Sequence, residues 1–297
     1  MKVGVIGAGT VGSTVAIKLY EQGYTIGTIA SRTSSKAVQL AKSVHAEVTE
    51  PYRVIEESDL ILLAPPDRVI APLVRELAAY FRLGQVIVHF SGSLSSSVMA
   101  AARLQGAKVL SIHPLQSFAS VEAALASLYG THFAIEGDDL ELGKRLVQDL
   151  GGIPHCFNAE YKSLYHAGAC MASNYLVVLT HLAVKLLSNA GFEPGEALNC
   201  LIPLMKGTLA NLEQVGLPAA LTGPIARGDY PVVAEHLKKL PEDIGEAYSL
   251  LGVWAVEIAQ AKGTLTPESK KEFQQILGGY KPPSRRVTGR RRVSSTR

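Results

Sequence analysis

The pattern of hydrophobic and polar positions divides the chain into two parts. In the first part, short apolar runs alternate with amphipathic segments as far as residue 157. Such runs are typical of parallel strands buried on both faces, and their alternation with helices predicts a doubly wound, mostly parallel α/β sheet. We expect strands at residues 2–6, 24–30, 46–48, 59–64, 85–90, 107–112, 132–135 and 153–157, with helices at 10–22, 35–43, 67–81, 96–104 and 138–150.

After residue 157 only helical patterns follow. Proline stands at the start of several of these segments and glycine just after their ends, the usual placement at helix termini. We expect helices at 160–190, 194–214, 231–239, 242–262 and 267–277, with a loop at 221–228. The chain is therefore predicted to consist of an α/β domain (1–155), an all-α C-terminal domain (156–277) and a tail (278–297).

Some of the predicted helices are apolar on most of their faces, notably at 175–179 and 250–256. A helix that is apolar all round must be buried on all sides, which is difficult for several helices in one small domain. We expect a homodimer formed through the helical domain, since two-fold dimers are the commonest oligomers. An ordinary monomeric helical core is the alternative.

The composition narrows the class of protein. Hydrophobic residues make up 47% and charged residues 19% of the chain, which is ordinary for a globular protein. No uninterrupted apolar run reaches the roughly 18 residues of a membrane-spanning helix, so we expect no membrane partner. The three cysteines are scattered and odd in number, which favours a reducing, cytoplasmic compartment without a disulfide framework.

The positive net charge belongs to the tail. Residues 278–297 hold seven Lys and Arg and no acid, and taking these seven charges from the net +3 leaves −4 for residues 1–277. We expect the tail to be a disordered, solvated extension. Aromatic residues are not interleaved with its basic groups as they are in single-strand binders, so no nucleic-acid partner is expected. A basic arm for nucleic acid or a membrane surface is the alternative.

A glycine-rich turn follows the first predicted strand and precedes the first predicted helix. Gly7 allows a tight turn, Gly9 allows the backbone to approach a pyrophosphate, and Gly12 allows the helix to pack closely on the strand. The N–H groups and the dipole of the helix would bind the anion. This context predicts a Rossmann dinucleotide site, with cofactor contacts from Gly7, Ala8, Gly9, Thr10, Val11 and Gly12.

The end of the second predicted strand indicates which dinucleotide binds. NAD sites usually place an acid there for the ribose 2′-hydroxyl, but this chain has Ser31, Arg32 and Thr33. A guanidinium can bind a 2′-phosphate through two hydrogen bonds, and hydroxyls can add further ones. We therefore predict NADP as the cofactor. The alternative is a solvated turn in which Arg32 contacts nothing.

Two other predicted strands also end in polar residues that would face the ligand-binding edge of the sheet. Ser91 could donate to a substrate carboxylate, although nearby serines could equally serve as helix caps. His113 could act as a proton donor near neutral pH, or be held by backbone contacts.

The predicted helix from residue 160 carries a polar stripe on an otherwise apolar surface. His166, Cys170, Ser173 and Asn174 fall on one helical face. The stripe could be catalytic, with His166 as acid and Asn174 orienting a substrate oxygen, or it could satisfy neighbouring helices. No third ligand accompanies His166 and Cys170, so we expect no metal site.

The predicted loop at 221–228 offers one more candidate group. Thr222 and Arg227 are candidate substrate contacts, because a guanidinium can bind a carboxylate through two hydrogen bonds. Arg227 could instead pair with Asp229 and hold the loop closed.

Together these features resemble the 6-phosphogluconate-dehydrogenase-like superfamily, in which a Rossmann domain precedes a helical dimerisation domain. Relatives include ketopantoate reductase, pyrroline-5-carboxylate reductase and 3-hydroxyisobutyrate dehydrogenase. The chain is more closely similar to bacterial Rossmann-like oxidoreductases with a C-terminal domain of unknown function, whose reaction is not established. The matching segments are residues 7–12, 31–33, 64–67, 89–92, 112–115, 165–168, 173–176 and 221–229.

The resemblance implies roles for several residues. In the superfamily, the loop matching Ala64, Pro65 and Pro66 covers the nicotinamide side of the cofactor. Relatives with established hydroxyacid or ketoacid reactions carry a Lys-x-x-x-Asn pair on the helix matching the one from residue 160. Asn174 fits the asparagine, but Cys170 stands in the lysine position. A thiol cannot replace an ammonium as proton donor, which is why His166 becomes the candidate acid.

The sequence thus predicts an NADP-dependent reductase or dehydrogenase. Hydride would pass between nicotinamide and a small oxo or hydroxy acid, with a ketopantoate-like compound as the best single guess, or an imine. Two alternatives stay open: a sensor or scaffold that binds NADP without turnover, and an NADPH-dependent deazaflavin reductase.

Overall fold

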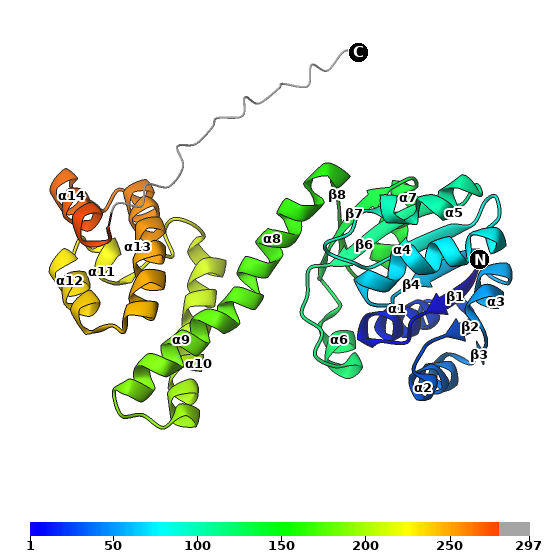
Figure 1. Ribbon diagram of the computed structural model, residues 1–297, viewed down its shortest axis with the longest axis horizontal. Coiled ribbons are helices and arrows are strands. Elements are labelled where there is room, and N and C mark those ends of the chain that lie inside the picture. Colours follow the sequence, from blue (N-terminus) through cyan, green and yellow to red (C-terminus); the bar gives the residue numbers. More distant parts are fainter. Residues whose placement is uncertain (279–297) are drawn as a thin grey trace, which may run out of the picture. The chain divides into compact units, whose positions relative to one another are not determined.

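The computed structural model describes residues 1–278 and forms two compact units (Figure 1). The first unit is Met1–Tyr175, and the second begins at Leu176. This division lies further along the chain than the boundary expected at residue 155, because the helix that starts at Lys162 bonds to the sheet of the first unit. The expected disordered tail lies, but for Gly278, outside the described residues.

The first unit is built on one eight-stranded sheet in the order β3-β2-β1-β4-β5-β6-β7-β8. All neighbours are parallel except β6 and β7, which are antiparallel. The predicted fold class is confirmed, and so are all eight predicted strands. Their bounds are β1 Lys2–Ile6, β2 Thr25–Ala30, β3 Glu47–Val48, β4 Leu60–Leu63, β5 Val86–His89, β6 Lys108–Pro114, β7 His132–Gly137 and β8 Ile153–Cys156.

Helices cover both faces of this sheet, because side chains of a central strand alternate between its two faces. One hydrophobic core joins the sheet to α1, α2 and α7, and a second joins it to α3, α4 and α5; α6 packs on α1. The short helices α3 and α6 were not predicted. The bounds are α1 Thr10–Glu21, α2 Ser34–Val44, α3 Pro51–Glu56, α4 Asp67–Glu76, α5 Ala100–Leu104, α6 Val121–Ser127 and α7 Leu140–Asp149.

The helical region confirms the sequence pattern with two differences. The single helix expected at 160–190 is broken at Ser173, and the expected loop at 221–228 contains the short helix α11. A small core around Val233, Val256 and Phe273 holds the second unit together. The bounds are α8 Lys162–Ala172, α9 Asn174–Asn189, α10 Pro194–Val215, α11 Gly223–Ala226, α12 Tyr230–Lys239, α13 Glu242–Lys262 and α14 Pro267–Ile276.

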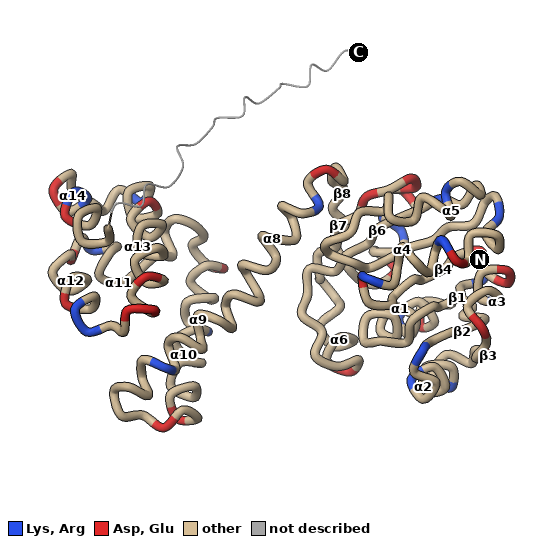
Figure 2. The backbone as a smooth tube through the Cα atoms, viewed as in Figure 1, with Lys and Arg blue, Asp and Glu red and all other residues tan. Residues whose placement is uncertain are grey.

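One helical stretch among residues 1–278, Ala159–Asn189, is long and apolar enough to cross a membrane by length and composition. It is not an uninterrupted apolar run, since Ser173, Asn174 and Thr180 lie within it, but residues 163–184 contain no Lys, Arg, Asp or Glu. Figure 2 accordingly draws the middle of this helical stretch in tan. The beginning of the stretch, however, is committed to the first unit, since Lys162 is only 3% exposed there.

Candidate functional site

The loop after β1 has the geometry that a dinucleotide site requires. Gly7 has a φ of +109°, a conformation that favours glycine. A Cβ on Gly12 would overlap the carbonyl oxygen of Gly7 and lie 2.9 Å from Cβ of Ala64. A Cβ on Gly9 would meet nothing within 4 Å. Gly7 and Gly12 therefore let protein pack on protein, whereas Gly9 leaves open space beside the backbone.

The same loop opens the N-terminus of α1 to an anion. Gly9 is the N-cap residue, no side chain caps the helix, and its first turn contains no acid. The backbone N–H groups of the first turn are thus available to a phosphate. A cavity of about 230 Å³ opens beside the loop, and Gly9, Thr10 and Lys36 are among its lining residues. These features fit a dinucleotide. Ala8 and Val11 support the loop by packing into the core.

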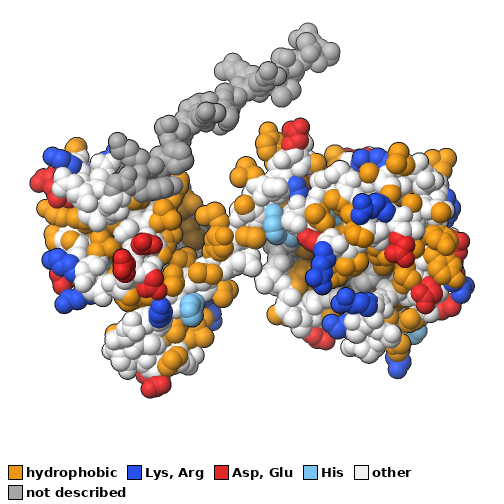
Figure 3. All heavy atoms as spheres, viewed as in Figure 1, with side chains coloured by type: hydrophobic (Ala, Val, Ile, Leu, Met, Phe, Trp, Pro, Cys, Tyr) orange, Lys and Arg blue, Asp and Glu red, His pale blue; other side chains and the backbone are white. Residues whose placement is uncertain are grey.

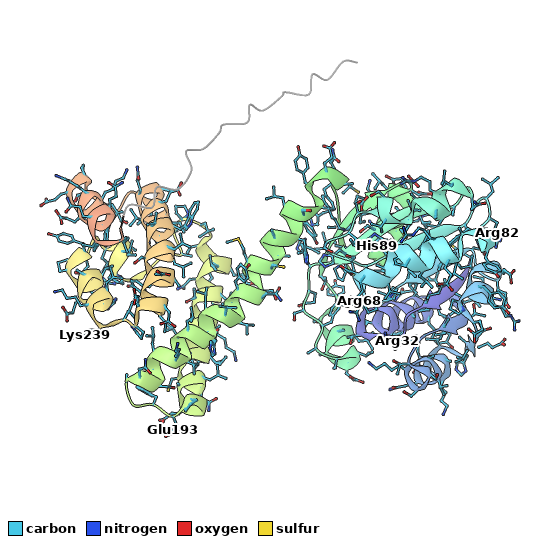
Figure 4. The ribbon with its side chains drawn as sticks, in the orientation of Figure 1. Arg32, Arg68, Arg82, His89, Glu193 and Lys239 are labelled. Atoms are coloured by element: carbon cyan, nitrogen blue, oxygen red, sulfur yellow. The ribbon has the colours of Figure 1, made fainter. Side chains whose placement is uncertain are left out.

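Arg32 lies in the turn between β2 and α2. Its side chain is exposed and makes no hydrogen bond or ion pair with any residue in 1–278. Ser31 beside it is half-buried and Thr33 is exposed. Figure 4 places Arg32, Arg68 and His89 toward the end of the unit where the parallel strands finish, and Arg82 at the opposite end. Arg32 is therefore free to bind a ligand at the expected edge.

The loop after β4 packs directly on the glycine loop. A Cβ on Gly7 would lie 2.6 Å from the carbonyl carbon of Ala64 and 2.8 Å from the nitrogen of Pro65. Pro66 is the N-cap residue of α4. The structure thus brings the residues 64–66 and 7–12 together, at the point where the strand order reverses between β1 and β4. Ligands of α/β sheets bind at such points.

Ser91 connects two of these loops. Its hydroxyl donates to the carboxylate of Asp67 at 2.7 Å and accepts the backbone N–H of Leu94 at 3.0 Å. Ser93 donates to the same carboxylate oxygen at 2.7 Å. The hydroxyl proton of Ser91 is therefore used within the loop, and the structure places it as a brace between α4 and the loop after β5.

The two predicted catalytic histidines meet over Gly92. His113 ends β6 and His166 lies on α8, and their ring centroids are 6.0 Å apart. A Cβ on Gly92 would lie 2.5 Å from Nδ1 of His166 and 2.7 Å from Nε2 of His113. Only glycine allows both imidazoles to approach the backbone here. The Nδ1 atom of His166 is buried and has no partner in the described chain.

The remaining nitrogens of this pair are held from α8. Nδ1 of His113 lies 2.6 Å from the hydroxyl of Tyr165, and Nε2 of His166 lies 3.6 Å from Sγ of Cys170. Burial raises the pKa of Tyr165 to about 12, so its hydroxyl remains protonated and can donate to His113. Tyr165 was not predicted; its position one residue before His166 was the only signal.

A buried charged network lies beside the histidines and was also not predicted. Lys162 donates to the hydroxyl of Ser111 at 2.7 Å. The carboxylate of Glu136 faces Ser111 across the β6–β7 pair and accepts the backbone N–H and the hydroxyl of Ser96, both at 2.7 Å. Lys162 stands four residues before His166, on the same face of α8, and this spacing was the available signal.

Burial sets the protonation of these groups. Burial lowers the pKa of Lys162 to about 8, and carboxylates including Glu136 oppose the shift. Burial, and then the charge of Lys162, lowers the pKa of both His89 and His113 to about 4. At neutral pH the lysine is therefore mostly charged and these two histidines are neutral.

The other predicted site residues are not part of this cluster. Asn174 is the first residue of α9, is exposed and makes no hydrogen bond within the described chain. Thr222 is the N-cap residue and Arg227 the C-cap residue of α11, in the second unit. Arg227 forms no ion pair with Asp229 or any other residue in 1–278. All three side chains are free to meet a ligand.

Comparisons with known proteins agree with this architecture. Residues 1–114 match the Rossmann-like domain, and residues 131–254 match the domain of unknown function DUF2520. The two matches follow one another along the chain, the first over the α/β sheet and the second from β7 into the helical region. No curated protein matches the sequence.

Solved structures extend the comparison. Protein TM1727 of Thermotoga maritima is 29% identical, with a TM-score of 0.71, over 88% of this chain and 99% of that one. Protein BF3122 of Bacteroides fragilis, provisionally assigned as an NADP oxidoreductase, is 25% identical, with a TM-score of 0.67, over 86% and 98%. An imine reductase from a Pseudomonas species is 17% identical, with a TM-score of 0.61, over 93% and 99%, and shows the same fold. Proteins assigned as oxidoreductases are thus among the structural neighbours of this chain.

His89 should make the stability depend on pH. The pKa of His89 is 6.5 in the unfolded chain and about 4 in the folded chain. Below pH 6.5, His89 therefore becomes protonated in the unfolded chain while it stays neutral in the folded chain. The free energy of unfolding should therefore decrease as the pH falls through this window, by up to about 1.4 kcal/mol per pH unit. Urea unfolding of the wild type and of His89→Gln at several pH values measures this. The variant should have a shallower pH dependence; equal slopes for His89→Gln and wild type would refute the assignment.

Proposed function

We propose that the protein is an NADPH-dependent reductase of a small oxo acid, or the dehydrogenase of the corresponding hydroxy acid. The observation that carries the proposal is the juxtaposition of two features at one edge of the sheet. A glycine loop with an open helix N-terminus lies at the reversal of strand order, and a half-buried pair of histidines lies over the loop after β5. The first suits a dinucleotide and the second suits proton transfer.

The residues of the glycine loop would hold the pyrophosphate through the N–H groups of α1. Arg32, with Ser31 and Thr33, would bind the 2′-phosphate of NADP, since Arg32 has no competing partner among residues 1–278. The stiff loop of Ala64, Pro65 and Pro66 would lie beside the nicotinamide. When bound, NADPH supplies the hydride that the substrate carbon receives.

The histidine pair would handle the proton. His166 has a free, buried Nδ1 and is the candidate acid for the substrate oxygen. His113, neutral at pH 7 and bonded to Tyr165 through Nδ1, would donate a hydrogen bond from Nε2. Asn174 is a candidate contact for the rest of the substrate, and Ser91 would act by shaping the loop. The substrate contacts predicted for Thr222 and Arg227 stay predictions. An imine is the second candidate substrate class.

The exposed apolar helices support a homodimer in the cytoplasm as part of the proposal. Val177, Leu204 and Val215 are 70%, 67% and 57% exposed in one chain. Hydrophobic side chains also cover much of the visible face of the second unit (Figure 3). A second copy of the chain would bury such exposed apolar side chains symmetrically. All three cysteines are free thiols, which accords with a reducing compartment.

Replacing Arg32 with alanine should weaken NADPH binding selectively. Charge-assisted hydrogen bonds to the 2′-phosphate would be lost, which should raise the Kd for NADPH about 10- to 100-fold, with little change for NADH. Fluorescence titration with both nucleotides measures the effect. Arg82→Ala, at the opposite end of the unit, is the matched control and should leave both affinities unchanged. Equal weakening of NADPH and NADH by Arg32→Ala would refute the 2′-phosphate assignment.

Turnover with a panel of oxo acids, imines and a deazaflavin should distinguish the candidate functions. We expect NADPH oxidation with a small 2-oxo acid, and a loss of about 100-fold or more in His166→Ala. The exposed control His155→Ala should retain full activity. Tight NADPH binding without oxidation by any compound would instead indicate a sensor or scaffold, and reaction only with the deazaflavin would indicate a deazaflavin reductase.

Sedimentation equilibrium should show twice the mass of one chain. Leu204→Glu places a charge on the exposed apolar surface of α10 and should shift the equilibrium toward monomer, because the charge would be buried on association. Leu104→Glu, at an 84% exposed position in the first unit, is the control. A monomeric wild type would contradict the dimer.

A further inference from the structure

Lys162 is the one lysine or arginine with a buried side chain in residues 1–278, at 3% exposure. Its ammonium bonds to the hydroxyl of Ser111 at 2.7 Å and lies 5.6 Å from the ring centre of Phe157 and 5.8 Å from that of Tyr165. No carboxylate within the described chain lies within 4.0 Å of it. Burying a charge without a direct ionic partner is unfavourable, so packing alone does not account for a lysine at this position.

The position of Lys162 relates it to both histidines of the site. Ser111 and His113 are two residues apart on β6, so they share one face of the sheet. Lys162 and His166 are four residues apart on α8 and share one face of the helix. The ring that flanks the ammonium belongs to Tyr165, whose hydroxyl contacts His113. Lys162 therefore bonds to the face of β6 that carries His113, from the face of α8 that carries His166.

We propose that Lys162 is a positioning residue whose buried ammonium keeps His113 neutral. The hydroxyl of Tyr165 then donates to Nδ1 of His113, and the proton of His113 resides on Nε2, the nitrogen that faces Gly92. This role rests on the proposed function for its chemical meaning. A neutral N–H donor backed by a fixed cation stabilises an oxygen that gains negative charge, and it repels a cationic iminium. The inference therefore favours a carbonyl substrate over an iminium.

Other charged and titratable groups around His113 act in both directions. From α8, Lys162 and His166 oppose its protonation; from β5, His89 does the same. From α4, Asp67 favours protonation, but it is exposed and its carboxylate is bonded to two serines. Burial and Lys162 outweigh it.

Histidine NMR titration tests the proposal without substrate or cofactor. With ¹⁵N-histidine labelling, and His113→Gln to assign the signals, wild-type His113 should show the neutral Nε2–H form from about pH 5 upward. A small inflection should appear near pH 8, where Lys162 loses its proton. Lys162→Met should abolish the inflection and raise the pKa of His113 by about one unit. Lys162→Arg should restore wild-type behaviour, and the surface control Lys144→Met should leave it unchanged.

Two results would overturn the proposal: a wild-type His113 without the inflection near pH 8, or a folded Lys162→Met variant with an unchanged His113 pKa. If Lys162→Met does not fold, the wild-type inflection alone decides. Because the titration requires neither NADPH nor turnover, its failure would leave the proposed reductase intact. Conversely, a protein without turnover could still show the coupling. In an active enzyme, Lys162→Met should lower kcat about tenfold or more with an unchanged KM for NADPH, and Lys162→Arg should recover it.

Discussion

Parallel strands buried on both faces must end at a common edge, and this constraint assembles everything of chemical interest in the first unit. Five strands contribute residues to this edge. Residues 7–12 follow β1, Arg32 follows β2, residues 64–66 follow β4, Ser91 follows β5, and His113 lies near the end of β6. Because β1 and β4 are neighbours, their loops touch, and the absence of a side chain at Gly7 makes that contact sterically acceptable. The site is thus a consequence of strand order together with a few small residues.

The second determinant of the site is a charge that water does not reach. Lys162 and Glu136 are both buried, yet they are joined to different serines rather than to each other. Such an arrangement is less stable than an apolar core of the same volume, and buried polar groups of this kind are common where function requires a fixed electrostatic field. Here the field acts on histidines that burial already disfavours as cations. The burial of Lys162, His89 and His113 therefore affects both the stability of the fold and the protonation of the site.

The sequence was sufficient to predict the sheet and the sharp turn of the glycine loop, because both depend on local sequence patterns. Apolar runs identify strands, and Gly7 and Gly12 identify a turn whose neighbours leave no room for a Cβ. The chemistry of the site was less accessible. Ser91 could be placed at a strand end, but the direction of its hydroxyl depends on Asp67, which comes from another loop. Lys162 and Ser111 are 51 residues apart, and no periodicity relates them. The short helices α3 and α6 contain too few residues to show a helical period.

Gly9, Gly12 and Gly92 would respond to mutation in different ways, with a consequence for screening and directed evolution. A side chain at Gly12 or Gly92 collides with protein atoms, so a stability screen would reject it. A side chain at Gly9 meets nothing, so the same screen would accept it while it fills the space beside the backbone. Libraries selected only for soluble expression would therefore accumulate changes at Gly9 unnoticed. At Gly9, unlike at Gly12, a substitution can fill the space open to a ligand without destabilising the fold.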